Sequence, residues 1–276
     1  MKSIIVSVFG LLLNPYLMHA QVCWVPVGAE SWGTGGQSVT SISVFGVQNN
    51  PASIALINNF KIGLYQEIRY RQAALTLSAL SVIKPGKFVN TGFGLVQQGT
   101  GNFNQQKINI SIAKVLNPQV SMGINFTFLG THIAEQEYKG NFLAEMGLIF
   151  KPNKALIFGC YVFNPTQVKF KQSIPEPIPA FVRIGFCYMF SAQLKFLGEF
   201  EHRIIFGNIP KFGFEYTPVP AFTFYTGWAQ NPQLICFGSG FNYKKTRWSI
   251  TASRHEVLGI TPHFSLVFNM DKKLKR

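Results

Sequence analysis

The ten residues QVSMGINFTF, Gln119 to Phe128, alternate between apolar and polar or small side chains at every step. A period of two predicts a β-strand with one apolar face and one polar face. Ten residues are also about the length that a tilted strand needs to cross a bilayer. We therefore expect the even-numbered side chains to face lipid. Ser121, Gly123, Asn125 and Thr127 would then face a lumen, and their small size leaves room there for a plug.

The composition fits a membrane protein that crosses the bilayer with strands. The 276 residues include 27 Phe, and the mean hydropathy is +0.16. After residue 20, however, no apolar run approaches the roughly 18 residues that a spanning helix needs. Closed barrels are the other structure that satisfies every backbone group in lipid. The sequence therefore predicts an all-β fold, a transmembrane antiparallel β-barrel.

Fourteen segments from Phe60 onward carry strand patterns. The predicted strands are roughly 60–70, 72–83, 87–97, 106–116, 119–129, 140–151, 154–163, 180–190, 193–203, 210–217, 220–229, 234–243, 247–254 and 262–269. The connections after even-numbered strands are short, and most of those after odd-numbered strands are longer. Outer-membrane barrels sort their connections in this way, with short periplasmic turns and longer extracellular loops.

The flanking segments differ from the barrel, and they divide the chain into four parts. Residues 1–20 have a positive start, an apolar stretch and a plausible cleavage site, which predicts a signal peptide. Residues 21–59 are rich in glycine and irregular, so they would lie in the lumen or at its mouth as a hatch or plug. Residues 60–270 would form the barrel, and residues 271–276 a basic tail. The predicted location is the bacterial outer membrane.

The formal net charge is +14, with a sequence pI near 9.7. The basic residues are scattered singly at segment ends, which does not suit a nucleic-acid surface, and we expect no nucleic-acid partner. They suit anionic outer-membrane lipid and lipopolysaccharide, or simply a solvated rim.

The residue types argue against most enzyme chemistry. Asp271 is the single aspartate, which removes aspartate dyads and Asp-rich metal loops. The histidines lack metal-ligand spacing, so no metal or cofactor is expected. Ser253, His255 and Glu256 offer the residue types of a serine hydrolase, but neighbours in sequence do not make a catalytic triad. We expect no catalytic residues and no enzymatic activity.

Several charged residues fall within the predicted strands. Because a charge facing lipid at mid-depth costs about 2–4 kcal/mol, these side chains should face the lumen. They would either line a polar path or form internal ion pairs. They are Glu67, Arg69, Glu145, Arg183, Glu199, Glu201 and Glu215.

Short motifs near both ends resemble a known family. Residues 28–39 and the motif Asn50-Pro51-Ala52 resemble the start of FadL-type outer-membrane barrels, and more closely the PorV/PorQ group of the Bacteroidota. Residues 253–266 are similar to the last hairpin of that group. With fourteen strands, the resemblance covers essentially the whole mature chain.

The resemblance implies that residues 21–59 form a hatch and that Asn50, Pro51 and Ala52 are its motif. FadL-like proteins admit hydrophobic molecules and release them through a gap in the barrel wall. The leading hypothesis is therefore that the protein binds or passes a small hydrophobic compound through a hatch-gated lumen. The alternative is a non-transporting partner or scaffold of type IX protein secretion, docking through residues 140–151 and the loop 175–179.

Overall fold

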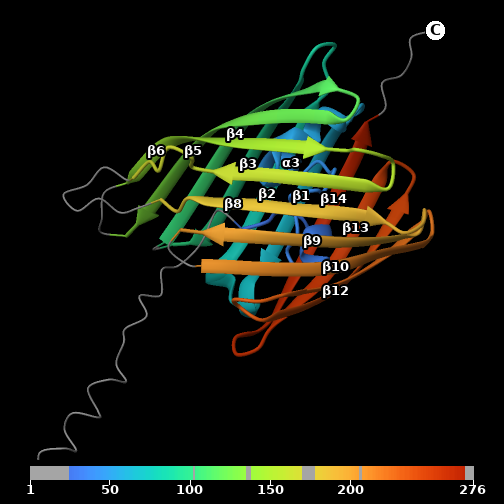
Figure 1. The fold of residues 1–276 in the computed structure, drawn as a ribbon. Coiled ribbons are helices and arrows are strands. Elements are labelled where there is room, and N and C mark those ends of the chain that lie inside the picture. Colours follow the sequence, from blue (N-terminus) through green and yellow to red (C-terminus); the bar gives the residue numbers. More distant parts are fainter. Residues whose placement is uncertain (1–24, 102, 135–137, 170–177, 205–206, 271–276) are drawn as a thin grey trace, which may run out of the picture.

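The computed structural model describes residues 25–101, 103–134, 138–169, 178–204 and 207–270, and the predicted signal peptide and basic tail lie outside them. The described chain forms a closed all-β barrel of fourteen antiparallel strands (Figure 1). Each strand pairs with its neighbours in sequence, and β1 pairs with β14 to close the ring. The strands are β1 (Phe60–Ile68), β2 (Thr76–Lys84), β3 (Asn90–Thr100), β4 (Phe103–Asn117), β5 (Val120–Ile133), β6 (Lys139–Phe150), β7 (Leu156–Phe163), β8 (Phe181–Met189), β9 (Leu194–Arg203), β10 (Gly207–Val219), β11 (Phe222–Ala229), β12 (Leu234–Tyr243), β13 (Thr246–His255) and β14 (Gly259–Met270).

The fourteen predicted strands are confirmed, but several run further than the pattern indicated. β3 extends to Thr100 and β4 begins at Phe103, so most of the predicted 98–105 loop is a hairpin. Glutamines lie on both faces there, so the alternation of apolar and polar residues is lost from the sequence. The backbone hydrogen bonds between the strands continue, because they do not require apolar side chains. Gly99, near the end of β3, and Gly101, in the turn, adopt positive φ of 87° and 63°. The connections between β3 and β4, β5 and β6, β9 and β10, and β13 and β14 are shorter than predicted, whereas the connection between β1 and β2, residues 69–75, is longer.

The two faces of the wall follow the alternation. On β5, Ser121, Asn125 and Thr127 are at most 2% exposed, whereas Phe126 between them is 61% exposed. Phe237 and Ile250, on β12 and β13, are exposed to a similar degree. An exterior of this kind is far more apolar than a soluble surface tolerates. Together with the closed barrel, it identifies a surface that lies in lipid.

We expect Ile250→Arg to lower the free energy of unfolding in lipid vesicles by about 2–4 kcal/mol, because it places a charge on the lipid face near the middle of the strand. Tyr243→Arg, at the end of β12, is the matched control. It should cost about 0–1 kcal/mol, because the side chain can reach the interface. Reversible urea unfolding in vesicles measures both, and equal costs would contradict this placement of the membrane.

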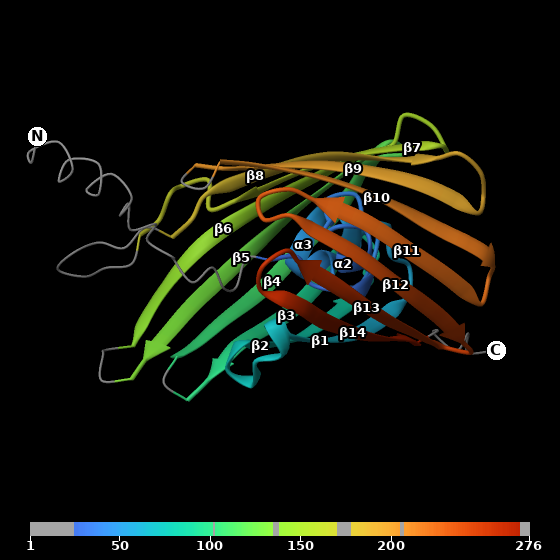
Figure 2. The same ribbon diagram turned by 90° about the horizontal axis from the view of Figure 1, so that it is seen from below.

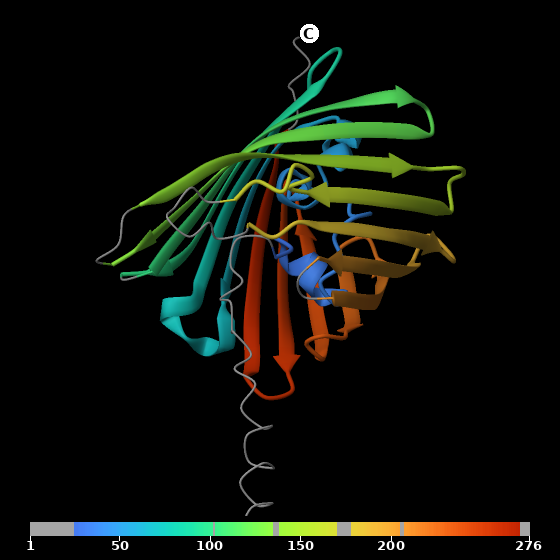
Figure 3. The same cartoon turned by 60° about the vertical axis from the view of Figure 1, so that its left-hand side comes forward.

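The elements other than strands are short helices. α2 (Ala29–Gly33), α3 (Gly46–Asn49) and η1 (Pro51–Leu56) belong to the N-terminal segment, residues 25–59, while η2 (Arg69–Arg71) and η3 (Ala73–Leu75) connect β1 to β2. Within the described residues, no helix is both long and apolar enough to span a membrane. The N-terminal segment lies inside the ring of strands, and α2 and α3 are visible through it in Figures 2 and 3.

Glycines on the inner face allow the N-terminal segment to approach the wall closely. A Cβ at Gly213 would lie 2.5 Å from the carbonyl oxygen of Thr34, and one at Gly227, its partner on β11, would overlap the backbone of Gly35. Gly159 bears the same relation to Val39. The small inward residues therefore leave the space in which the segment lies.

The largest apolar core lies between this segment and one side of the barrel. Phe45 and Ile54 of the segment belong to the same buried cluster as Tyr65, Leu77 and Val96 of β1, β2 and β3. All five side chains are at most 3% exposed. The segment thus supplies apolar packing inside a wall whose own apolar side chains mostly face outward.

Candidate functional site: a lumen occupied by the N-terminal segment

Two cavities lie on opposite sides of the N-terminal segment. The outer cavity, about 670 Å³, is at the end where β1 leads into η2, and Trp32, Gly35 and Gly36 line it. The inner cavity, about 800 Å³, is at the end of the short turns and is lined by Glu30 and residues 40–44. Since the same segment contributes to both linings, it stands between them in the lumen.

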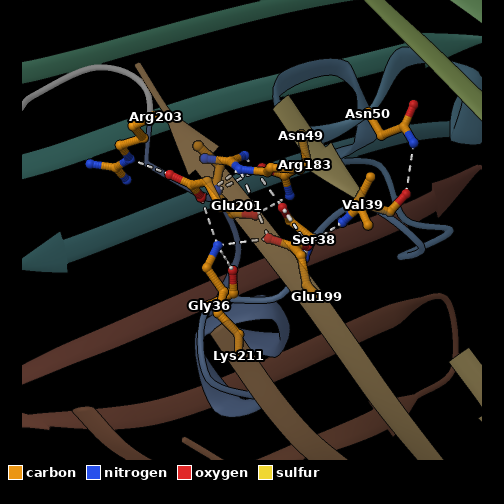
Figure 4. A network of polar contacts seen from close by, with 11 residues as sticks. Gly36, Ser38, Val39, Asn49, Asn50, Arg183, Glu199, Glu201, Arg203 and Lys211 are labelled. Atoms are coloured by element: carbon orange, nitrogen blue, oxygen red, sulfur yellow. Dashed lines mark hydrogen bonds and ion pairs between the residues drawn. The ribbon is translucent and has the colours of Figure 1, made fainter. Parts of the chain in front are cut away.

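A polar network joins the segment to the wall on one side (Figure 4). Glu199 Oε2 accepts hydrogen bonds from the backbone N–H of Ser38, at 2.7 Å, and of Val39, at 2.8 Å. Lys211 Nζ donates to Gly36 O at 3.1 Å and to Glu199 Oε1 at 2.7 Å. We call Glu199, Glu201, Arg183, Arg203 and Lys211 the latch network, because they tie the segment to β8, β9 and β10.

Glu201 is the shared anion of the latch network. Its carboxylate binds Arg183 Nε and Lys211 Nζ, each at 2.8 Å, and also pairs with Arg203. Glu201 is 0% exposed and its three cationic partners are at most 7% exposed. Buried charges of this kind are tolerated only when they are paired, so each partner depends on the others.

A second network centres on Glu145, on β6. Lys107 Nζ binds Glu145 Oε1 at 2.8 Å, and Asn125 Nδ2 and Tyr161 OH donate to its Oε2 at 2.7 and 2.8 Å. Asn125 Nδ2 also donates to Val47 O of the segment, at 2.9 Å. These charged residues form internal ion pairs, the second of the two arrangements expected from the sequence.

The motif Asn50-Pro51-Ala52 lies where the segment meets β5 and β6. Asn50 Oδ1 accepts from the Ala52 N–H at 3.1 Å and so caps η1, with Pro51 in the first turn. Asn50 Nδ2 donates to Val39 O at 2.7 Å. The motif therefore holds together two parts of the segment, next to the glycines of the wall.

The outer cavity contains a hydrogen-bonded chain that the sequence did not indicate. Ser253 Oγ lies 2.8 Å from His263 Nε2, and His263 Nδ1 lies 2.8 Å from Tyr65 OH, which donates to Glu67 Oε2 at 2.6 Å. Trp32 stacks on the His263 ring, with centroids 4.8 Å apart.

His255 is the histidine nearest to Ser253 in the sequence, but it forms hydrogen bonds within its own turn instead. Its Nδ1 accepts from the N–H groups of Val257 and Leu258, and Glu256 is exposed. The pairing that the structure shows crosses from β13 to β14, and position in the sequence could not reveal it.

Arg69, beyond the end of β1, pairs with Glu67. Burial alone would lower the pKa of the Arg69 guanidinium, but the charge and the hydrogen bond of Glu67, together with Tyr65 and Tyr70, raise the pKa overall. The rim of the outer cavity therefore keeps a charged arginine. Among the described residues there is no group of three or more His, Cys, Asp or Glu side chains that could hold a metal ion.

The comparisons with known proteins show the fold alone. No family model matches the chain, and no curated protein matches it. The solved structures include a CymD monoaromatic hydrocarbon channel, at 13% identity and TM-score 0.68 over 91% of this chain and 100% of that one. They also include a Pseudomonas putida toluene transporter, TodX, at 11% identity and TM-score 0.69 over 90% and 100%, and a Pseudomonas aeruginosa FadL homologue, at 11% and 0.64 over 89% and 98%.

The chain has the fold of these FadL-type channels. The fold and the apolar exterior together place the protein in the bacterial outer membrane. The similar structures are described as transport channels rather than enzymes.

Proposed function

We propose that the protein passes a small hydrophobic compound across the outer membrane and that the N-terminal segment acts as a hatch. The observation that carries the proposal is the pair of cavities, about 670 and 800 Å³, on opposite sides of that segment. Both volumes fall within the range of about 300–1,000 Å³ that is usual for pockets that bind small molecules. Passage between them requires the segment to move, and no catalysis is needed for it.

The route that we propose runs from the outer cavity to the inner cavity. FadL-like proteins release their compounds through a gap in the wall. Here, β1, β2, β3 and β4 pair in continuous register, with an irregularity at the short-turn end of β4. Such pairing supports an exit along the lumen, past the segment, rather than through this part of the wall.

The latch network supplies a moveable attachment. Its hydrogen bonds to the segment involve backbone atoms of Gly36, Ser38 and Val39 and the Ser38 hydroxyl, and none of these atoms takes part in apolar packing. The Val39 side chain, in contrast, is buried in an apolar cluster with Leu129 and Tyr161 and would have to leave it when this part moves. Phe45 and Ile54 are held in the largest apolar core. We propose that residues 30–40 move during passage while residues 44–57 stay in place.

We expect Glu199→Gln to raise the uptake rate of radiolabelled toluene by cells carrying the protein in their outer membrane. Hydrogen bonds to a charged group contribute about 1.5–3 kcal/mol each, so loss of the charge loosens residues 36–39. Glu215→Gln is the matched control, because Glu215 on β10 also lines the inner cavity but forms its ion pair with Lys195 rather than with residues 36–39. It should leave uptake unchanged.

The hatch motif gives a second variant for this assay. Asn50→Ala removes the cap of η1 and the bond to Val39 O, and it should also change uptake. If neither Glu199→Gln nor Asn50→Ala differs from the native protein, the hatch proposal is wrong. If cells carrying the native protein take up no more toluene than cells lacking it, the proposal that the protein passes this class of compound is wrong as well.

The finer assignment to the PorV/PorQ group, with a role in type IX secretion, rests on the short sequence motifs. Residues 140–151 of the expected docking region lie in β6 and the turn after it, and most of the loop 175–179 lies outside the described residues. The channel folds of the similar structures favour transport over this alternative.

A further inference from the structure

We propose that Ser253 is a nucleophile, activated by His263, and that it hydrolyses small carboxylic esters that enter the outer cavity. This activity goes beyond passage and departs from the expectation that the protein has no catalytic residues. Ser253, His263 and Glu67 all line the outer cavity. They come from three strands, β13, β14 and β1, which are adjacent in the closed barrel.

The geometry is that of a nucleophile, a base and a group that orients the base. Ser253 Oγ lies 2.8 Å from His263 Nε2, within the range for transfer of its proton. Nδ1 of the same ring faces Tyr65 OH at 2.8 Å and Glu67 Oε2 at 3.3 Å. With Tyr65 donating to Glu67, Nδ1 carries the proton and Nε2 is left to accept from Ser253. Arrangements of this type recur on unrelated folds.

The imidazole is held firmly in this orientation. Trp32 of the N-terminal segment stacks on it, with an angle of 15° between the ring planes, and Trp32 is itself fixed by a bond from its Nε1 to Pro26 O at 3.0 Å. Arg69 pairs with Glu67 behind it. Tyr65, Glu67 and Trp32 are therefore positioning residues, and Ser253 and His263 are the catalytic residues.

The surroundings suit the charge that develops during ester cleavage. Arg69, Arg203 and Lys211 line the outer cavity, against the two carboxylates Glu67 and Glu201. The cavity therefore has a net positive charge without any contribution from histidine. Positive charge that is already in place near the reacting carbonyl stabilises the oxyanion of a tetrahedral intermediate.

The reaction balances with water as the co-reactant. Ser253 Oγ bonds to the ester carbonyl carbon as its proton passes to His263 Nε2. The bond from that carbon to the alkoxy oxygen breaks, and His263 returns the proton to the departing alcohol. Water then attacks the acyl-serine, its proton passes through His263 to Ser253, and a carboxylic acid is released.

Serine labelling and ester turnover test the proposal in the full-length protein, folded in detergent. A fluorophosphonate probe should label the native protein, and Ser253→Ala should abolish the label and the hydrolysis of p-nitrophenyl butyrate. His263→Ala should lower the hydrolysis rate by about 10²- to 10⁴-fold. Tyr65→Phe should shift the pH profile of hydrolysis, an effect that a purely structural role would not produce.

The matched control is Ser249→Ala, because Ser249 is also buried on the inner face of β13 but its hydroxyl contacts Glu30. It should keep both label and turnover. Heat-modifiable gel mobility shows that each variant is folded. Equal labelling of native protein and Ser253→Ala, or turnover no faster in native protein than in Ser253→Ala, would overturn the proposal. Toluene uptake, measured separately, tests the channel independently of this serine.

Discussion

Replacing Glu201 by glutamine is expected to lower the free energy of unfolding by about 3–5 kcal/mol, which is the usual cost of removing one partner from a buried ion pair. Glutamine has nearly the same shape, so the change removes charge and leaves little cavity. Arg183, Arg203 and Lys211 would remain buried with one carboxylate, Glu199, in place of two. Burying charge that is not compensated in this way is costly.

Reversible urea unfolding in lipid vesicles would measure this loss. Glu215→Gln is the matched control: its pair with Lys195 also has a separation of 2.7 Å, but the two side chains are 22% and 34% exposed. Exposed pairs contribute about 0–1 kcal/mol, so the control should stay within that range. A loss for Glu201→Gln as small as that of the control would show that the lumen around the latch network is well hydrated.

A valine at position 227 is expected to displace the N-terminal segment while the barrel still forms. A Cβ there would overlap the backbone of Thr34 and Gly35, and backbone atoms cannot rotate away as a side chain can. Overpacking of this kind typically costs about 1–3 kcal/mol. β11 itself loses nothing, since valine favours a strand. The strain would therefore be relieved by movement of α2 and the residues that follow it.

Limited proteolysis would detect this displacement as new cleavage within residues 25–59, while heat-modifiable gel mobility reports that the barrel is intact. Thr226→Val is the control, because the neighbouring side chain is exposed on the opposite face of the same strand. It should leave the segment protected. Protection of the segment in Gly227→Val would mean that the wall yields instead, and the glycines would then not be what positions the hatch.

Both variants also bear on function. Glu201 fixes Lys211, which donates to Gly36 O. Gly227 allows Gly35, the residue before Gly36, to approach the wall. If the segment is a hatch, either change should raise toluene uptake together with its structural effect. A structural effect without a change in uptake would separate the packing of the segment from any role in passage.

Strand number and the direction of each side chain could be predicted from sequence because both follow from a local period of two. The alternation in residues 119–128 correctly placed Ser121, Asn125 and Thr127 inside. The same parity could have found Lys211, which the sequence analysis did not single out. Phe212 and Phe214 face outward, so Lys211 and Gly213 must face the lumen.

The ends of the strands were harder to predict. Around Gln98 and Gln105 both faces are polar, and the period disappears although the hydrogen-bonded ladder continues. Backbone pairing does not depend on apolar side chains, so a polar hairpin reads as a loop in the sequence. The predicted connection was therefore too long at this hairpin, whereas the predicted connection between β1 and β2 was too short.

The sequence by itself determined the barrel, with its fourteen strands, its apolar outer face and its inner face of small and charged residues. Only the tertiary structure decided which inner residues meet, because contacts across strands depend on register, and a shift of one residue would turn a side chain to the other face. Register places Arg183 opposite Glu201 and Lys211 opposite Glu199, and it brings Ser253 to His263 rather than to His255. The path of residues 25–59 is likewise settled by packing inside the closed ring, through contacts with residues more than a hundred positions away.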